Sequence, residues 1–118
     1  MSSAVEPSEL QARAAFARLD AATLVSLARA SRRAARAAGD LVAEGKGSPS
    51  SPVLIEEGVA WVVRHGHRVG RLGPGDVVDA AGVSGGASIV AATPMRVIVL
   101  PPAARRLSPY LRDWMQAR

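Results

Sequence analysis

The spacing of apolar residues changes about a third of the way along the chain. In the first part, apolar positions recur every three or four residues, as in Leu24, Leu27 and Ala28, and this spacing is typical of helices. Ser8 and Asp20 stand just before the two apolar runs and are residue types that cap helix N-termini. We therefore expect one helix after Ser8 and a second after Asp20.

The rest of the chain has the pattern of a small β-domain. Short apolar runs alternate with Gly, Pro and Ser at intervals of roughly ten residues. His65-Gly66 suits a tight two-residue hairpin turn, and Gly73-Pro74-Gly75-Asp76 suits a turn that Asp76 caps through its side chain. The expected strands are residues 41–44, 53–56, 59–64, 67–72, 77–78, 88–92 and 95–100.

An arginine cluster lies between the helical part and the first of these strands. Arg29, Arg32, Arg33 and Arg36 fall on one face if this segment stays helical. Such a stripe is either a solvated basic face or a contact surface for an anionic partner such as nucleic acid. With only four aromatic residues in the chain, we expect nucleic-acid binding to be weak at most.

Length and composition limit the classes of protein to consider. The 118 residues suit one domain, and its core must be built from Ala, Val, Leu and Ile because aromatic residues make up only 3%. The absence of cysteine excludes disulfides, thiolate metal sites and cysteine nucleophiles. No apolar run is long enough to span a membrane, and the first residues lack the pattern of a signal peptide. We expect a cytoplasmic protein.

In the order of its motifs, the chain resembles the cyclic nucleotide-binding domain family, the β-roll of catabolite-activator-type regulators and kinase regulatory subunits. The resemblance covers about residues 16–108 and is carried by residues 16–19, 38–45, 54–58, 69–78 and 91–101. It implies a mainly β fold with flanking helices, a small double-stranded β-helix or jelly roll. It also implies that residues 31–37 form the first strand, although their Ala and Arg residues favour a helix.

We divide the chain accordingly into a flexible N-terminus (residues 1–8), the β-roll with its leading helix (9–108) and a helical tail (109–118). Leu111, Trp114 and Met115 form an apolar stripe in that tail, which either packs on the chain's own roll or anchors a partner. The chain ends at Arg118, so we expect no DNA-reading module and no direct control of transcription.

The resemblance places the ligand site directly after Gly75 and Asp76. In binding members of the family, a Glu there accepts from the ribose hydroxyl, and an Arg after a short helix pairs with the cyclic phosphate. Here the segment is shorter, and both charged positions are lost. Asp79 and Ala80 align with the family's Gly-Glu pair, and Gly85, Gly86 and Ala87 replace the Arg and the residues after it.

We therefore expect a degenerate site without ordinary cyclic-nucleotide binding, because an unpaired phosphate in a dry pocket is costly. The expected role is a non-catalytic protein-interaction or assembly module, through a protein partner or self-association, without a cofactor. The alternative is a sensor of cyclic AMP or cyclic GMP. It would take an atypical phosphate contact from Arg68, Arg71 or Arg96, the nearest arginines in sequence.

Other sites of chemistry have weaker support. Residues 82–86 match the G-x-S-x-G string of serine hydrolases, but an apparent strand and not a helix follows Ser84. His65 and His67 alone are too few for a zinc site. Asp76 and Asp79 form a possible carboxylate pair, although Asp76 fits the turn better. We expect no enzyme and no metal, and leave open a smaller ligand for the glycine-rich loop 82–86.

Overall fold

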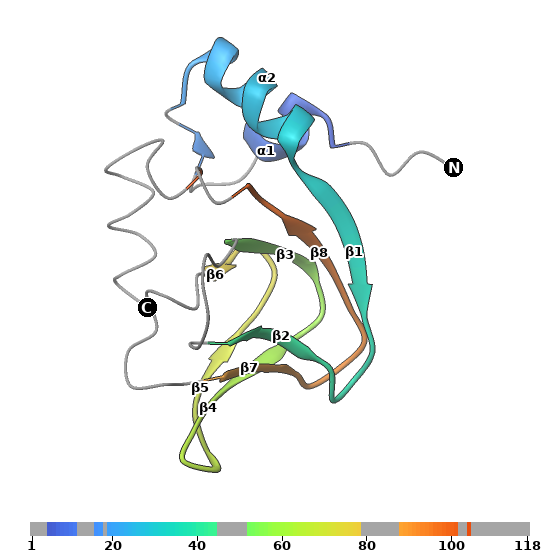
Figure 1. Cartoon of the computed structure of the whole chain (residues 1–118), viewed down its shortest axis with the longest axis vertical. Coiled ribbons are helices and arrows are strands. Elements are labelled where there is room, and N and C mark those ends of the chain that lie inside the picture. Colours follow the sequence, from blue (N-terminus) through green and yellow to red (C-terminus); the bar gives the residue numbers. More distant parts are fainter. Residues whose placement is uncertain are drawn as a thin grey trace.

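The computed structural model describes residues 5–11, 16–17, 19–44, 52–78, 88–101 and 104, and these form two short helices and two facing β-sheets (Figure 1). Every strand pairing is antiparallel, and each sheet has four strands. The first sheet has the order β1-β8-β3-β6 and the second the order β2-β7-β4-β5. The expected mainly β fold with a leading helical part is confirmed. The elements are α1 (Pro7–Gln11), α2 (Ala21–Ala30), β1 (Arg32–Arg36), β2 (Leu41–Glu44), β3 (Val53–Glu57), β4 (Ala60–Arg64), β5 (His67–Leu72), β6 (Val77–Val78), β7 (Ser88–Ala91) and β8 (Met95–Val99).

The first sheet is covered on both of its faces. On β3, Leu54 packs in the cluster formed with the helices, whereas its neighbours Val53 and Ile55 pack between the two sheets. This alternation follows from the two-residue period of a strand. Because both faces are buried, β3 is a continuous apolar run and not an alternating one. The helices and the second sheet thus enclose the first sheet, as Figure 1 shows.

Each helix begins with its own capping arrangement. Asp20 caps α2 as expected, because its carboxylate accepts from the backbone N–H of Thr23 at 2.8 Å. Hydrogen bonds from the side chain and the backbone of Thr23 lower the pKa of the Asp20 carboxyl below its usual value. Ser8, in contrast, lies inside α1, so the expected cap there is wrong. Glu6 precedes the helix, and the Glu9 carboxylate accepts from the N–H of Glu6 at 2.8 Å.

The arginine cluster does not form a helical stripe, because residues 32–36 form the first strand, as the family resemblance implies. Arg32–Arg36 is strand β1, which pairs with β8 in the register Arg33 to Ile98. Successive side chains of a strand point to opposite faces, so Arg33 lies on the helix side of the sheet and Arg32 on the other. Pairing with the apolar strand β8 outweighs the weak local preference of Ala and Arg for a helix.

Both predicted turns are present. His65 and Gly66 have φ values of 53° and 79°, as a primed hairpin turn between β4 and β5 requires. In the second turn, Gly75 has a φ of 90° and the N–H of Asp76 donates to the carbonyl of Gly73 at 3.1 Å. The strands agree with the expected ranges to within one residue at each end. The tail that was expected to be helical, residues 109–118, lies outside the described residues.

Candidate functional site

The turn that precedes the expected ligand site is joined to the roll by hydrogen bonds. Asp76 is 8% exposed, and its carboxylate accepts from the backbone N–H of Gly73 at 2.8 Å. The backbone of the turn bonds to β3, where Gly75 N–H donates to Ile55 and Ile55 N–H donates to Asp76, each at 2.9 Å. The predicted cap by Asp76 is therefore confirmed.

The remaining predicted site residues are not placed. Asp79, Ala80, Gly85, Gly86 and Ala87 lie outside the described residues, as does the whole glycine-rich loop 82–86 with Ser84. Leu111, Trp114 and Met115 of the tail lie outside them as well. Their proposed roles remain predictions from the sequence.

The space between the two sheets is filled with apolar side chains. Ile55, Ile89 and Val97 are fully buried there, and the described cluster is completed by Val42, Val53, Ala60, Leu72, Val78, Ala91 and Met95. Asp76 is the single buried charged or polar side chain among the described residues. No arginine or lysine is buried as a whole residue in this part of the chain, although the Nε atom of Arg64, on the same face of β4 as Ala60 and Val62, is buried.

The three arginines considered for an atypical phosphate contact point away from this interior. Arg71 pairs in register with Trp61 on β4, whose neighbours Ala60 and Val62 pack inward. The guanidinium of Arg68 lies over the Trp61 ring, 4.7 Å from its centroid. Arg96 lies on the helix side of the first sheet and pairs with Glu57 at 3.7 Å. The folded conformation therefore offers none of the three to a ligand inside the roll.

An outward face of the second sheet was not foreseen from the sequence. Leu41, Val90, Trp61 and Arg71 are register partners on four adjacent strands, so their side chains form one row across that face. Leu41 is 47% exposed, and neither Trp61 nor Val90 belongs to a core cluster. The available signal was the alternation along β4, which places Trp61 and Val63 together on the side opposite Ala60.

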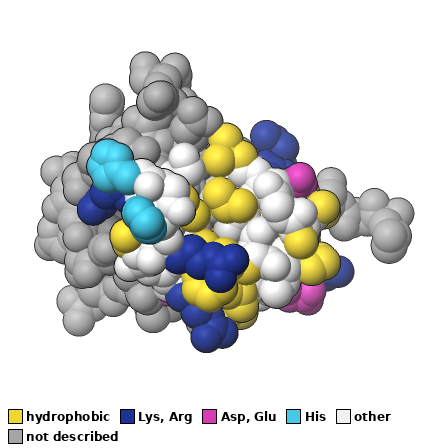
Figure 2. Space-filling model, turned by 90° about the horizontal axis from the view of Figure 1, so that it is seen from below, with side chains coloured by type: hydrophobic (Ala, Val, Ile, Leu, Met, Phe, Trp, Pro, Cys, Tyr) yellow, Lys and Arg dark blue, Asp and Glu magenta, His cyan; other side chains and the backbone are white. Residues whose placement is uncertain are grey.

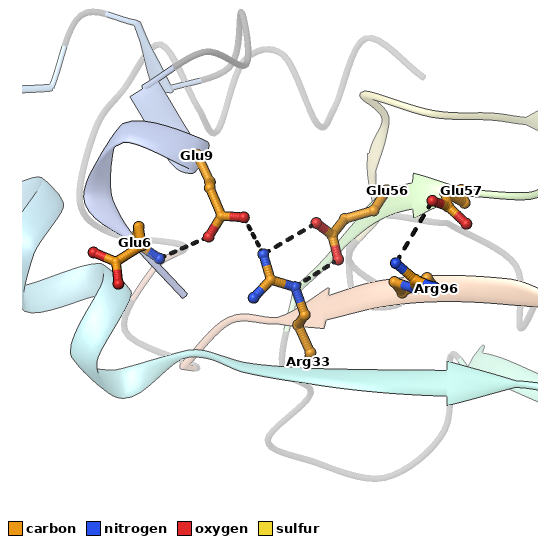
Figure 3. A network of polar contacts seen from close by, with 6 residues as sticks. All are labelled: Glu6, Glu9, Arg33, Glu56, Glu57 and Arg96. Atoms are coloured by element: carbon orange, nitrogen blue, oxygen red, sulfur yellow. Dashed lines mark hydrogen bonds and ion pairs between the residues drawn. The ribbon is translucent and has the colours of Figure 1, made fainter. Parts of the chain in front are cut away.

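A charged network links the first sheet to α1 (Figure 3). The guanidinium of Arg33 donates to Glu56 through Nε at 3.1 Å and Nη2 at 3.4 Å, and Nη2 also donates to Glu9. The hydrogen bond with Glu56 and the nearby carboxylates raise the pKa of Arg33 above its usual value. The three side chains come from β1, β3 and α1. Arg33 therefore has a structural role and is not part of a basic surface stripe.

The other candidate sites gain no support from the described residues. His65 and His67 are exposed at the hairpin end, and no group of three His, Cys, Asp or Glu residues suited to a metal ion is found within the described ranges. No helix in that same part of the chain is long and apolar enough to cross a membrane.

Comparison with solved structures identifies the architecture. A putative cyclic nucleotide-binding protein from Geobacter metallireducens matches 96% of this chain and 94% of its own length, with a TM-score of 0.81 and 20% identity. The regulatory domain of Toxoplasma gondii protein kinase A, solved with cyclic AMP, matches 94% of this chain with a TM-score of 0.75 and 20% identity. The chain has the fold of a cyclic nucleotide-binding domain.

A third structure with the cyclic nucleotide-binding fold is described as the regulatory subunit of a cyclic AMP-independent protein kinase A from Trypanosoma brucei. It matches 92% of this chain at 20% identity, with a TM-score of 0.74. The present chain spans 47% of the Toxoplasma chain and 42% of the Trypanosoma chain. No protein-family model matches the sequence, and no curated protein matches it either.

Proposed function

We propose that this domain is a non-catalytic member of the cyclic nucleotide-binding fold that has lost ordinary ligand binding and acts as a protein-interaction or assembly module. The observation that carries the proposal is the lack of a cation for the phosphate. No arginine or lysine occurs between Arg71 and Arg96, the stretch that contains the expected ligand site. Those two arginines themselves lie on outward faces of the sheets.

The physical argument concerns the charge of the ligand. A cyclic nucleotide carries a phosphate that stays ionised, and burying an ion without a partner costs several kcal/mol or more. A charge-assisted hydrogen bond from Arg offsets this cost in binding sites of this kind. The side chains of the described cluster between the sheets are apolar, so none of them can offset this cost.

The comparisons are compatible with such a role. The Trypanosoma neighbour is named as the regulatory subunit of a cyclic AMP-independent kinase. The same fold thus occurs in a subunit of a kinase that is described as independent of cyclic AMP. For the present chain, we propose a cytoplasmic domain without cofactor or catalytic activity. Leu111, Trp114 and Met115 of the tail are proposed as one partner contact on the basis of their helical spacing.

The proposal is tested by calorimetric titration of the purified chain with cyclic AMP and with cyclic GMP at low salt. A well-characterised cyclic AMP-binding domain serves as the positive control for the nucleotide stocks. We expect a flat trace for this chain. Saturable binding tighter than about 100 µM, or about 5.5 kcal/mol, would overturn the proposal and identify a sensor with a rebuilt phosphate contact.

A further inference from the structure

The outward face of the second sheet has the composition of an interaction surface. Its central row is Leu41, Val90, Trp61 and Arg71, and Val63 adjoins this row on β4. Arg68 completes the set because its guanidinium lies over the Trp61 ring. We call these six residues the Trp61 face. Tryptophan and arginine beside aliphatic side chains are the residue types enriched at protein interfaces.

The charge of the Trp61 face has one sign. Arg68 and Arg71 lie on it, the hairpin that carries them (Ala60 to Leu72) has no aspartate or glutamate, and β7 carries no charged residue. Acidic residues of the second sheet stand only at the two ends of β2. One of them, Asp40, already accepts a hydrogen bond from the N–H of Ala37 at 2.7 Å. Figure 2 shows basic and histidine side chains beside hydrophobic ones on the side seen from below.

The contact between Arg68 and Trp61 preorganises the guanidinium of Arg68 for binding a carboxylate. A guanidinium held 4.7 Å from the ring centroid has less freedom to lose when it binds. A guanidinium that lies over a ring can still donate its N–H groups to a carboxylate, and Arg can donate two of them to one carboxylate. Arg71, the register partner of Trp61, provides a second cation on the adjacent strand.

We propose that the Trp61 face binds an acidic protein segment that also carries apolar side chains. This inference rests on the proposed function as an interaction module and names the chemistry of the partner. Carboxylates of the segment pair with Arg68 and Arg71, and its apolar side chains pack on Leu41, Val63 and Val90. A single nucleic-acid strand fits less well. Strand-binding platforms stack successive bases on several aromatic rings, whereas the described residues of this face include one ring, and a guanidinium already covers it.

The test measures binding of a short fluorescent peptide of mixed Glu and Leu residues by fluorescence anisotropy at low salt. The double variant Arg68→Glu/Arg71→Glu changes the Trp61 face. The matched control is Arg29→Glu/Arg32→Glu, which makes the same change of charge at two exposed positions on α2 and β1. We expect saturable binding to the wild-type chain, a loss of about tenfold or more in the first variant and little change in the control.

Further probes separate the sources of binding. Trp61→Ala should weaken binding of the mixed peptide without changing the net charge of the protein. A poly-Glu peptide of equal charge should bind less tightly than the mixed peptide. No binding of the mixed peptide would overturn the inference. Equal losses in the two double variants would do so as well, as would tighter binding of oligothymidylate that displaces the peptide. Melting followed by circular dichroism verifies that each variant is folded.

The outcomes also distinguish this inference from the proposed function. A flat cyclic-nucleotide trace together with no peptide binding overturns only the assignment of the Trp61 face. Saturable binding of cyclic AMP or cyclic GMP overturns the proposed function whatever the peptide does.

Discussion

Arg33 on β1 holds the carboxylate of Glu56 on β3 although the strand β8 lies between them. The same guanidinium bonds to Glu9 of α1, so one cation connects the edge of the first sheet, an inner strand and the leading helix. The side chain of Arg33 is 21% exposed and that of Glu56 is 14% exposed. Water therefore screens this pair less than it screens an ordinary surface pair.

Replacing Arg33 by Met should lower the free energy of unfolding by about 1–3 kcal/mol, because two partly buried carboxylates lose a charged hydrogen-bond donor. Arg96→Met is the matched control, since Arg96 and Glu57 are 60% and 65% exposed and their pair should contribute at most about 1 kcal/mol. Urea unfolding of the three proteins measures both effects. Equal destabilisation by the two substitutions would contradict a special role for Arg33.

Gly58→Ala should be more damaging than Gly39→Ala. Both glycines have a left-handed backbone, with φ values of 97° and 91°, where an added side chain is strained by about 1–2 kcal/mol. At Gly58 the new Cβ would also lie 2.6 Å from the carbonyl oxygen of Pro94, whereas at Gly39 it would meet nothing within 4 Å. Thermal melts should show the larger loss at Gly58. A larger loss at Gly39 would be inconsistent with the packing around Pro94.

The two sides of the second sheet should respond differently to truncation. Ile89 is fully buried between the sheets, so Ile89→Ala should lower the free energy of unfolding by about 2–5 kcal/mol. Val69 is 55% exposed on β5, and Val69→Ala should change it by no more than about 0.5 kcal/mol. Denaturant titration compares the two variants. A costly change at Val69 would indicate that this strand is covered in solution, for example by self-association.

The Asp20 cap should make part of the stability depend on pH. Because the hydrogen bonds from Thr23 lower the pKa of Asp20 in the folded state, its ionised form stabilises α2 at neutral pH. That contribution is present above the ordinary carboxyl pKa of about 3.9 and is lost as the pH falls through the lower folded value.

Asp20→Asn keeps a capping side chain but does not titrate. The stability of the wild type relative to this variant should therefore decrease as the pH is lowered into the acid range. Parallel melts of both proteins over that range measure the difference. A difference that stays constant or increases toward acid pH would contradict the assigned cap.

The strands, the two turns and the buried face of α2 were predictable because local chemistry and tertiary packing agree there. Val53 to Ile55 are β-branched or apolar, and Asp76 has the side chain that its turn requires. At β1 the two disagree. Ala and Arg favour a helix, and only the resemblance to a known fold indicated the strand that β8 imposes.

The candidate site was less predictable than the fold. The role of Arg33 depends on Glu9 and Glu56, which are far from it in sequence, and no local pattern announces such a contact. The Trp61 face likewise depends on the register of four strands, which brings Leu41 and Val90 beside Trp61. The lack of arginine and lysine between Arg71 and Arg96, in contrast, is visible in the sequence alone because it concerns residue types and not contacts.

The hydrogen bond between Asp76 and Gly73 also bears on how such a domain evolves. This hydrogen bond fixes the chain just before β6, which precedes residues 79–87. The strand that follows those residues, β7, is fixed by pairing with both β2 and β4. The frame on either side of residues 79–87 is thus secured by contacts outside that stretch. Doubling the length of a flexible loop costs only about 0.6 kcal/mol. A loop between two strands anchored in this way can therefore change in length and composition during evolution while the roll is kept, so one scaffold can carry different specificities.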